Sequence, residues 1–153
     1  MAKISDLLTD EKKTLVVDSA IETGQVFRIK LTEDEEVKAK NKGEDGRNKY
    51  FIVLGFDDKK TIGAVLINTN INPNLSQKLK DLHYPLYVKN YSFLKYDSFV
   101  DCGSLKPIAK EKYESKLDSF VGEINKDDME LILKTVSQDA PIEIKKLKRF
   151  GLI

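Results

Sequence analysis

Two apolar, β-rich segments joined by a short polar turn constrain this chain more than any other feature. Residues 49–56 read KYFIVLGF, residues 61–68 read TIGAVLIN, and the four residues between them are all charged. Runs of this length and composition around a polar turn are typical of a β-hairpin. Gly55 and Gly63 lie near its ends, where a bulge or a close backbone approach needs a residue without a side chain.

Further strands are predicted on both sides of this hairpin. Residues 25–31 (QVFRIKL) alternate apolar and basic side chains with the period of a half-buried strand. Residues 84–89 (YPLYVK) predict another strand, and its proline places it at an edge or at a strand start. Residues 98–102 and 105–108 predict two short strands joined by a tight Gly-Ser connection, followed by a Lys/Glu-rich linker.

The clearest helix is predicted near the end of the chain. Asn125 is a good N-cap, and two aspartates follow it in the first turn, where the helix dipole favours anions. The apolar residues recur at the spacing of one buried helix face: Met129, Ile132, Leu133 and Val136. A helical turn is also expected within residues 74–82.

Three segments leave alternatives open. Residues 32–48 carry four consecutive acids, then lysines and two glycines, which indicates a mobile loop that is either a solvated connector or a cover for a site. Residues 1–23 form an N-terminal extension, helical or β-stranded. Residues 137–153 form a basic C-terminal extension, whose IEIKKLKRF segment is either an extra strand or a basic tail. The cations and Phe150 of this tail either bind RNA or balance the acidic loop.

Length, charge and composition limit the classes of protein to which this chain can belong. At 153 residues the chain is interpreted as a single domain, residues 1–153, long enough to bury roughly two-thirds of its unfolded surface. Its net charge is +1, so attraction to nucleic acid has to come from a local patch. No segment approaches the ~20 apolar residues of a membrane helix, and the first residues lack a signal-peptide pattern. We therefore expect a cytoplasmic protein without a membrane partner.

The single cysteine, Cys102, excludes a disulfide within the chain and a zinc site built from cysteines. Its position at the end of an apolar strand favours a buried thiol. No Gly-rich phosphate loop is present, and neither a cofactor nor a metal is expected.

Five or six short strands with helices late in the chain predict a mainly β, α+β fold. The expected architecture is a small barrel of strongly bent antiparallel strands with a C-terminal helix packed on it. Residues 24–136 would form the barrel and the helix.

Several segments, taken in order, resemble the MazF/PemK toxin family, as a divergent member. The opening strand, the hairpin and the Asp-Ser-aromatic strand fall where the family has comparable segments, and a short strand and helix close both chains. The matching segments are residues 24–27, 46–54, 65–70, 97–100, 104–108 and 119–136. The family's Arg-Pro pair is missing: Lys49 and Tyr50 stand in its place, with Arg47 two residues before Lys49.

The resemblance implies an SH3-like barrel of the CcdB/MazF type and a metal-independent endoribonuclease that cleaves single-stranded RNA (an mRNA interferase). It also implies a homodimer and a small antitoxin protein as partner, in a type II toxin-antitoxin system. By the same resemblance, Arg47 or Lys49 would supply the catalytic cation and Thr69 a hydroxyl donor. Further RNA contacts would come from Asn68, Asn70, His83 and Lys106.

Other interpretations stay open at this point. Arg47 and Lys49 are also compatible with a solvated strand start, Thr69 with a turn, and His83 with an ordinary loop residue. The chain as a whole is also compatible with a catalytically inactive toxin-like barrel that binds a protein or nucleic acid. A third possibility is an accessory protein whose residues 32–48 become ordered on a partner.

Overall fold

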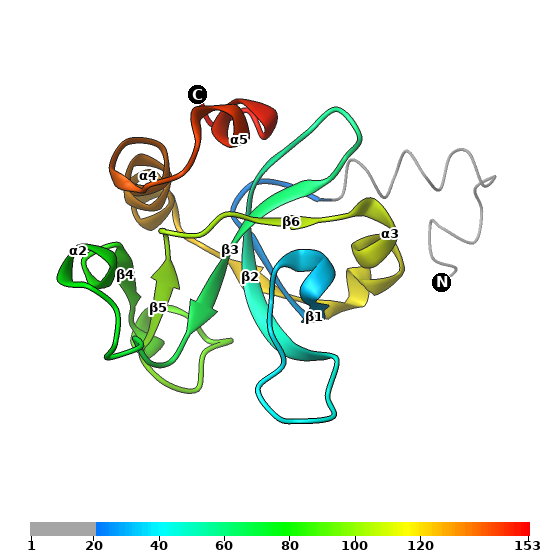
Figure 1. Cartoon of the computed structure of the whole chain (residues 1–153), viewed down its shortest axis with the longest axis horizontal. Helices are drawn as coiled ribbons and strands as arrows, with labels where there is room; N and C mark the ends of the chain where they lie inside the picture. Colours follow the sequence, from blue (N-terminus) through cyan, green and yellow to red (C-terminus); the bar gives the residue numbers. More distant parts are fainter. Residues whose placement is uncertain (1–20) are drawn as a thin grey trace.

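The computed structural model describes residues 21–153, and the predictions made for residues 1–20 lie outside this range. The fold is α+β: a seven-stranded antiparallel sheet with helices concentrated toward the C-terminus (Figure 1). The strands are β1 (Gln25–Thr32), β2 (Gly46–Phe56), β3 (Ile62–Asn68), β4 (His83–Leu86), β5 (Ser98–Asp101), β6 (Lys106–Ile108) and β7 (Phe120–Glu123). The predicted strands are confirmed, with boundaries shifted by at most three residues.

The sheet has the order β4-β5-β3-β2-β1-β7, and β6 also pairs with β3. Pro85 lies in the end strand β4, as predicted for a proline that cannot donate a ladder hydrogen bond. The strands β5 and β6 pair with opposite ends of β3. Within residues 21–153 no pairing joins β4 to β7, so the hydrogen-bonded sheet is open and does not close into a barrel.

Helical segments are interspersed among the strands along the chain, and the last three elements are all helical. The α-helices are α2 (Gln77–Lys80), α3 (Lys110–Tyr113), α4 (Lys126–Lys134) and α5 (Ile144–Arg149). The 3-10 helices are η2 (Glu33–Glu35), η3 (Val88–Asn90) and η4 (Glu114–Ser119), and a π-helical turn, η5 (Thr135–Asp139), extends α4. The predicted Lys/Glu-rich linker is therefore helical, as α3 and η4. No helix within the described range is long and apolar enough to cross a membrane.

The central strands are buried on both faces, which explains their almost unbroken apolar sequence. Successive side chains of a strand point to opposite faces, and β2 divides accordingly. Ile52 and Leu54 belong to a core cluster that α4, α5 and β5 complete. Phe51 and Val53 belong to a second cluster, which β6 and α3 complete. Figure 1 shows α4 and α5 close together, with α3 on the far side of the sheet.

The glycines of the central hairpin make room for the C-terminal segment. A Cβ on Gly63 would lie 2.5 Å from Cγ of Phe150, and a Cβ on Gly55 would lie 2.2 Å from the carbonyl oxygen of Phe150. The β2–β3 register also shifts between Val53 and Gly55. The predicted bulge and close backbone approach are both confirmed.

The helix α4 begins as predicted and is anchored to the sheet by a carboxylate. The Asn125 side chain accepts a hydrogen bond from the backbone N–H of Asp128. The hydroxyl of Tyr84 donates to Oδ1 of Asp128 over 2.5 Å, and the hydroxyl of Tyr91 donates to Oδ2. Burial and this carboxylate raise the pKa of Tyr84 to about 12.

Both predictions for the C-terminal segment, an extra strand or a basic tail, are wrong. Residues 144–149 form a helix. Leu147 and Phe150, three residues apart, are both buried, which is the spacing of a helix face. Nε of Arg149 donates a hydrogen bond to Oδ2 of Asp57 over 3.0 Å, and Nη2 forms an ion pair with the same oxygen at 3.0 Å. This ion pair and the buried phenyl ring dock α5 on the hairpin turn.

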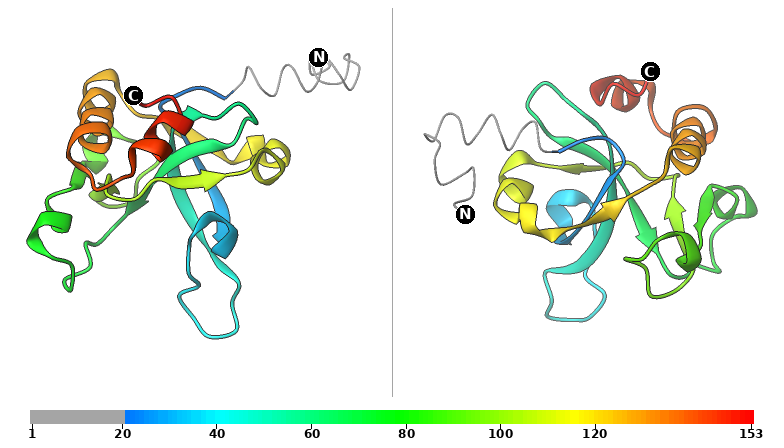
Figure 2. Two further views of the ribbon diagram at one scale, coloured as in Figure 1. Left: turned by 45° about the horizontal axis from the view of Figure 1, so that its top comes forward. Right: turned by 180° about the vertical axis from the view of Figure 1, so that it is seen from behind.

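Residues 32–48 are only partly the solvated loop that the sequence suggested. Thr32 and Glu35 form a capping box around η2, and Glu35 is buried beside Lys112, with Oε1 3.2 Å from Nζ. The segment between η2 and β2 projects away from the sheet in the views of Figure 2. Local capping therefore orders the acidic run, although its composition alone favours disorder.

Candidate functional site

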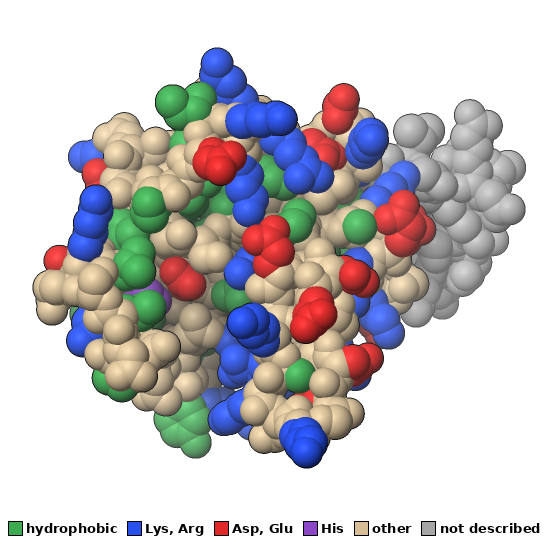
Figure 3. Space-filling view, in the orientation of Figure 1, with side chains coloured by type: hydrophobic (Ala, Val, Ile, Leu, Met, Phe, Trp, Pro, Cys, Tyr) green, Lys and Arg blue, Asp and Glu red, His purple; other side chains and the backbone are tan. Residues whose placement is uncertain are grey.

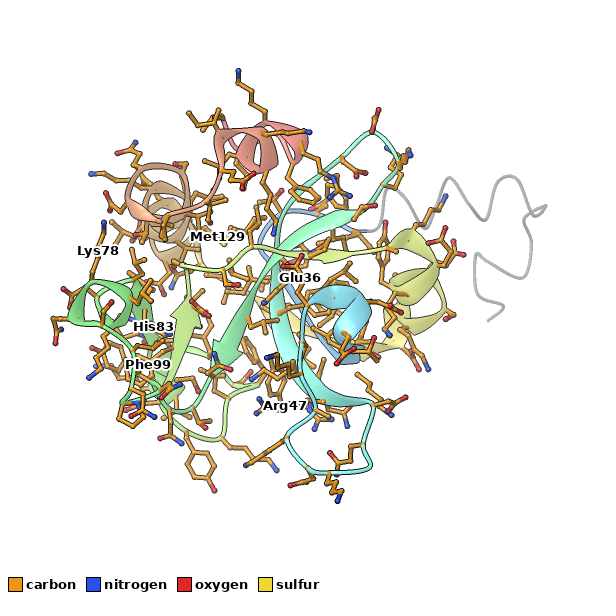
Figure 4. All side chains as sticks on the ribbon, in the orientation of Figure 1. Glu36, Arg47, Lys78, His83, Phe99 and Met129 are labelled. Carbon is orange, nitrogen blue, oxygen red and sulfur yellow. The ribbon has the colours of Figure 1, made fainter. Side chains whose placement is uncertain are left out.

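A pocket of about 560 Å³ opens where β2 begins and β3 ends. Its lining includes six of the seven site residues predicted from the sequence: Arg47, Lys49, Asn68, Thr69, Asn70 and His83. We call it the cationic pocket. In Figure 4, His83 lies on the β4 side of this region and Arg47 on the side of the projecting loop.

Antiparallel pairing brings these residues together. Tyr50 pairs with Ile67, so Lys49 and Asn68 are the next neighbours across β2 and β3. On the other side, His83 pairs with Asp101 across β4 and β5. Residues as far apart in the sequence as Arg47 and Asp101 therefore meet at one end of the sheet.

Lys49 is the most constrained of these side chains. It is 9% exposed, and its Nζ atom donates a hydrogen bond to Oδ1 of Asn68. Burial and, after it, the nearby Arg47 charge lower its pKa to about 8, against the opposite effect of Asp101. An amine with this pKa exchanges its proton near neutrality, which an ordinary lysine does not.

His83 is held in a defined orientation. Its Nδ1 atom lies 3.0 Å from the carbonyl oxygen of Leu79, which can only accept, so Nδ1 carries the hydrogen. Nε2 lies 3.8 Å from Oδ1 of Asp101, and the histidine side chain is only 6% exposed. His83 is thus a fixed pocket residue and not an ordinary loop histidine.

Asp101 was missed by the sequence analysis. It is the last residue of β5, and its Oδ1 accepts a hydrogen bond from the backbone N–H of Gly103 over 3.1 Å. A carboxylate at the end of an apolar strand is a weak signal, because its cross-strand partner depends on the register. Lys40, from the projecting loop, was also missed and lines the same pocket.

Arg47 and Thr69 keep their side chains available. Thr69 is exposed just beyond the last residue of β3, and Arg47 is half-buried in β2. Within residues 21–153, no hydrogen bond or ion pair engages the Arg47 guanidinium or the Thr69 hydroxyl. A guanidinium in this state can bind two oxygens of a phosphate at once.

Lys106 is the predicted site residue that the structure does not bring to this pocket. It lies in β6 opposite Ala64, and its Nζ atom donates to the carbonyl oxygen of Glu36 over 2.9 Å. The proposed stacking of Phe150 on a base is wrong, because its ring is 1% exposed. Lys146 Nζ lies 3.6 Å from Oε2 of Glu36, which supports the view that the C-terminal cations balance the acidic loop.

Cys102 is buried, as predicted from its place after an apolar strand. Burial and the neighbouring Asp101 carboxylate raise the pKa of its thiol to about 12. The thiolate is therefore scarce at neutral pH, and the thiol is a packing group.

The charge balance of the cationic pocket favours an anion. Lys40, Arg47 and Lys49 face a single carboxylate, Asp101. Figure 3 shows lysine and arginine side chains gathered on this face beside the projecting loop. Among residues 21–153, no cluster of three His, Cys, Asp or Glu side chains is placed to hold a metal ion.

Comparison with known proteins found no protein-family model that matches the chain and no curated protein with a similar sequence.

Proposed function

We propose that this protein is a metal-independent endoribonuclease that cleaves single-stranded RNA in the cationic pocket. The proposal takes the chain as a divergent MazF/PemK-like toxin with a partly open SH3-like barrel of the CcdB/MazF type. A homodimer, a small antitoxin protein and a cytoplasmic location belong to the same proposal. The order of the matching segments supports the family, and the pocket supports the activity.

One observation carries the proposal: the residues named for this chemistry from the sequence line a single pocket. Arg47, Lys49 and Thr69 come from the start of β2 and the end of β3, and the antiparallel register joins these two places. The recess that these residues share carries a net positive charge, which suits a phosphate ligand.

The chemistry uses the nucleophile that RNA carries. The 2′-oxygen attacks the adjacent phosphorus, its proton leaves to a base, and the P–O5′ bond breaks as the 5′-oxygen takes up a proton. The products are a 2′,3′-cyclic phosphate and a 5′-hydroxyl end. Catalysis therefore needs a proton acceptor, a proton donor, and cationic groups around the phosphorane.

The pocket offers a residue for each role. Arg47 would bind two phosphate oxygens, and the Thr69 hydroxyl would donate to one of them. Lys49, whose pKa is about 8, and Nε2 of His83, which carries no hydrogen when Nδ1 does, would serve as the proton donor and acceptor. Asp101 would act as a positioning residue, since it faces His83 across the β4–β5 pair.

The test is cleavage of a long single-stranded RNA by the purified full-length protein in EDTA, with mapping of the new ends. We expect 5′-hydroxyl ends and activity in the chelator. Thr69→Ala, or Arg47→Ala combined with Lys49→Ala, should reduce the cleavage rate at least a hundredfold. Lys78→Ala is the matched control, because it removes an exposed cation from α2 outside the pocket. No cleavage by the wild type at micromolar concentration would contradict the activity.

The missing Arg-Pro pair favours a second candidate, a catalytically inactive barrel that binds nucleic acid or protein through the same pocket. Lys49, in the arginine's place, presents one ammonium that already donates to Asn68, and a lysine is a weaker phosphate clamp than a planar guanidinium. RNA binding that depends on Arg47, without any new RNA ends, would select this second function.

A further inference from the structure

A second pocket, of about 460 Å³, meets the cationic pocket at Thr69, which lines both. It has an apolar floor that includes Ile67 and Leu94, and Tyr50 and Tyr96 contribute aromatic rings. Lys49 and Tyr50 are adjacent in β2 and so point to opposite faces of the sheet. The two pockets therefore lie on either side of the sheet edge where β3 ends.

The second pocket combines aromatic surface with uncompensated positive charge. Arg28 and Lys95 line it, and its lining contains no aspartate or glutamate. In two other pockets a lining cation is paired with a carboxylate of the same pocket: Lys30 with Asp45 over 2.5 Å, and Lys112 with Glu35 over 3.2 Å. Within the described part of the chain, no ion pair neutralises Arg28 or Lys95.

The two tyrosines of this pocket differ in how far neighbouring side chains enclose their rings. Tyr50 is held in place by Phe93, with ring centroids 6.0 Å apart, and by the Arg28 guanidinium, 5.7 Å from its ring centroid. Tyr96 is 68% exposed, the most exposed large hydrophobic residue of the described chain. An aromatic ring in this state is available to stack on a planar ligand.

We propose that this second pocket binds the base of the nucleotide next to the phosphate held in the cationic pocket. The base stacks on Tyr96 above the apolar floor, and Arg28 and Lys95 contact the flanking phosphates. The single strand crosses the sheet edge at Thr69. This inference rests on the proposed function, and it adds a subsite that limits the substrate to unpaired nucleotides, since a base within a duplex cannot stack on a protein ring.

The experiment measures the affinity of the full-length protein for a 2′-O-methyl RNA oligonucleotide, which lacks the nucleophile and separates binding from cleavage. Tyr96→Ala should weaken binding about tenfold, and Tyr96→Phe should leave it unchanged. Tyr87→Ala is the control, because it removes another exposed tyrosine that does not line the pocket. Lys95→Ala should make the dependence of affinity on salt concentration less steep, by the equivalent of about one released counterion.

An abasic scan of the same oligonucleotide locates the base. One abasic position should reproduce the loss caused by Tyr96→Ala, and combining the two should cause no additional loss. Equal effects of Tyr96→Ala and Tyr87→Ala, or no effect of either, would overturn the subsite. A Tyr96-dependent affinity for a poly-glutamate peptide, without oligonucleotide binding, would also overturn it and indicate an acidic protein ligand. Tyr96-dependent binding without RNA cleavage would retain the subsite and reject the nuclease.

Discussion

The Nζ atom of Lys49 donates a hydrogen bond to Oδ1 of Asn68 across the β2–β3 pair, where the lysine is almost fully buried. A buried ammonium loses hydration, and one amide oxygen does not replace it. The structure therefore carries a destabilised cation at the place where the candidate function needs one. Such groups are typical of functional sites, and stabilising contacts elsewhere in the fold offset their cost.

Replacing this lysine should stabilise the protein. The pKa of Lys49 is about 8 in the folded chain against an ordinary value of 10.5, so its cost is fully present below pH 8 and is relieved as the pH rises to 10.5. We expect Lys49→Met to increase the free energy of unfolding at pH 7 by about 1–3 kcal/mol. Urea denaturation at pH 7 and pH 10 checks this, because the gain should shrink at the higher pH. A loss of stability at pH 7 would contradict the assignment.

The same proton should control RNA affinity. Below pH 8 the Lys49 side chain is an ammonium and attracts phosphate, and above pH 8 it is a neutral amine. We expect the affinity for 2′-O-methyl RNA to fall as the pH rises through about 8. Fluorescence anisotropy from pH 6.5 to 9.5 measures it. In Lys49→Arg the decrease should be absent, since arginine keeps its charge over this range; an unchanged profile in that variant would point to another group.

The orientation of His83 predicts different outcomes for two amide substitutions. The side-chain nitrogen of asparagine can replace Nδ1 and keep the bond to the Leu79 carbonyl, whereas the nitrogen of glutamine corresponds to Nε2. We expect His83→Asn to fold with nearly wild-type stability and His83→Gln to lose about 1 kcal/mol. Thermal unfolding compares them. RNA cleavage should fall at least tenfold in both, since neither amide transfers a proton at neutral pH.

The ion pair between Asp57 and Arg149 should make the free energy of unfolding depend on pH in the acidic range. Burial tends to raise the pKa of Asp57, but the backbone N–H groups of Thr61 and Lys59 and the Arg149 guanidinium lower it below 3.8. Its contribution is therefore present above pH 4 and is lost as the pH falls through the lowered value. Arg149→Ala should cost about 1–2 kcal/mol at pH 7 and less at pH 3. Lys148→Ala, an exposed neighbour in α5, is the control.

The contact between Gly63 and Phe150 should appear as strong coupling in a double-mutant cycle. Gly63→Ala places a methyl group within 3 Å of the phenyl ring and should cost about 1–3 kcal/mol. In a Phe150→Ala background the added methyl has room, so its cost should nearly vanish. Gly103→Ala, whose Cβ would approach nothing closer than 3.3 Å, is the control for loss of glycine. Additive effects of Gly63→Ala and Phe150→Ala would exclude the contact.

Local patterns predicted the strands well because side-chain periodicity and turn chemistry act within a few residues. The alternation in residues 25–31, the charged turn after Phe56 and the Asn125 cap all have the roles that their sequence indicates. The prediction for the C-terminal segment was wrong because such local patterns were ambiguous there. Its apolar residues fit both a period of 2 and a period of 3.6, and only the docking of Leu147 and Phe150 on the core selects the helix.

The sequence by itself determined where the hairpin, the edge strand and the capped helix lie, and it named six residues that line one pocket. Only the tertiary structure decided that Lys49 is buried, that Asp101 faces His83, and that Phe150 is inaccessible to ligand. The reason is physical: burial and cross-strand partners depend on sheet register and on which elements cover each face. These are fixed by contacts between residues that are distant in the sequence.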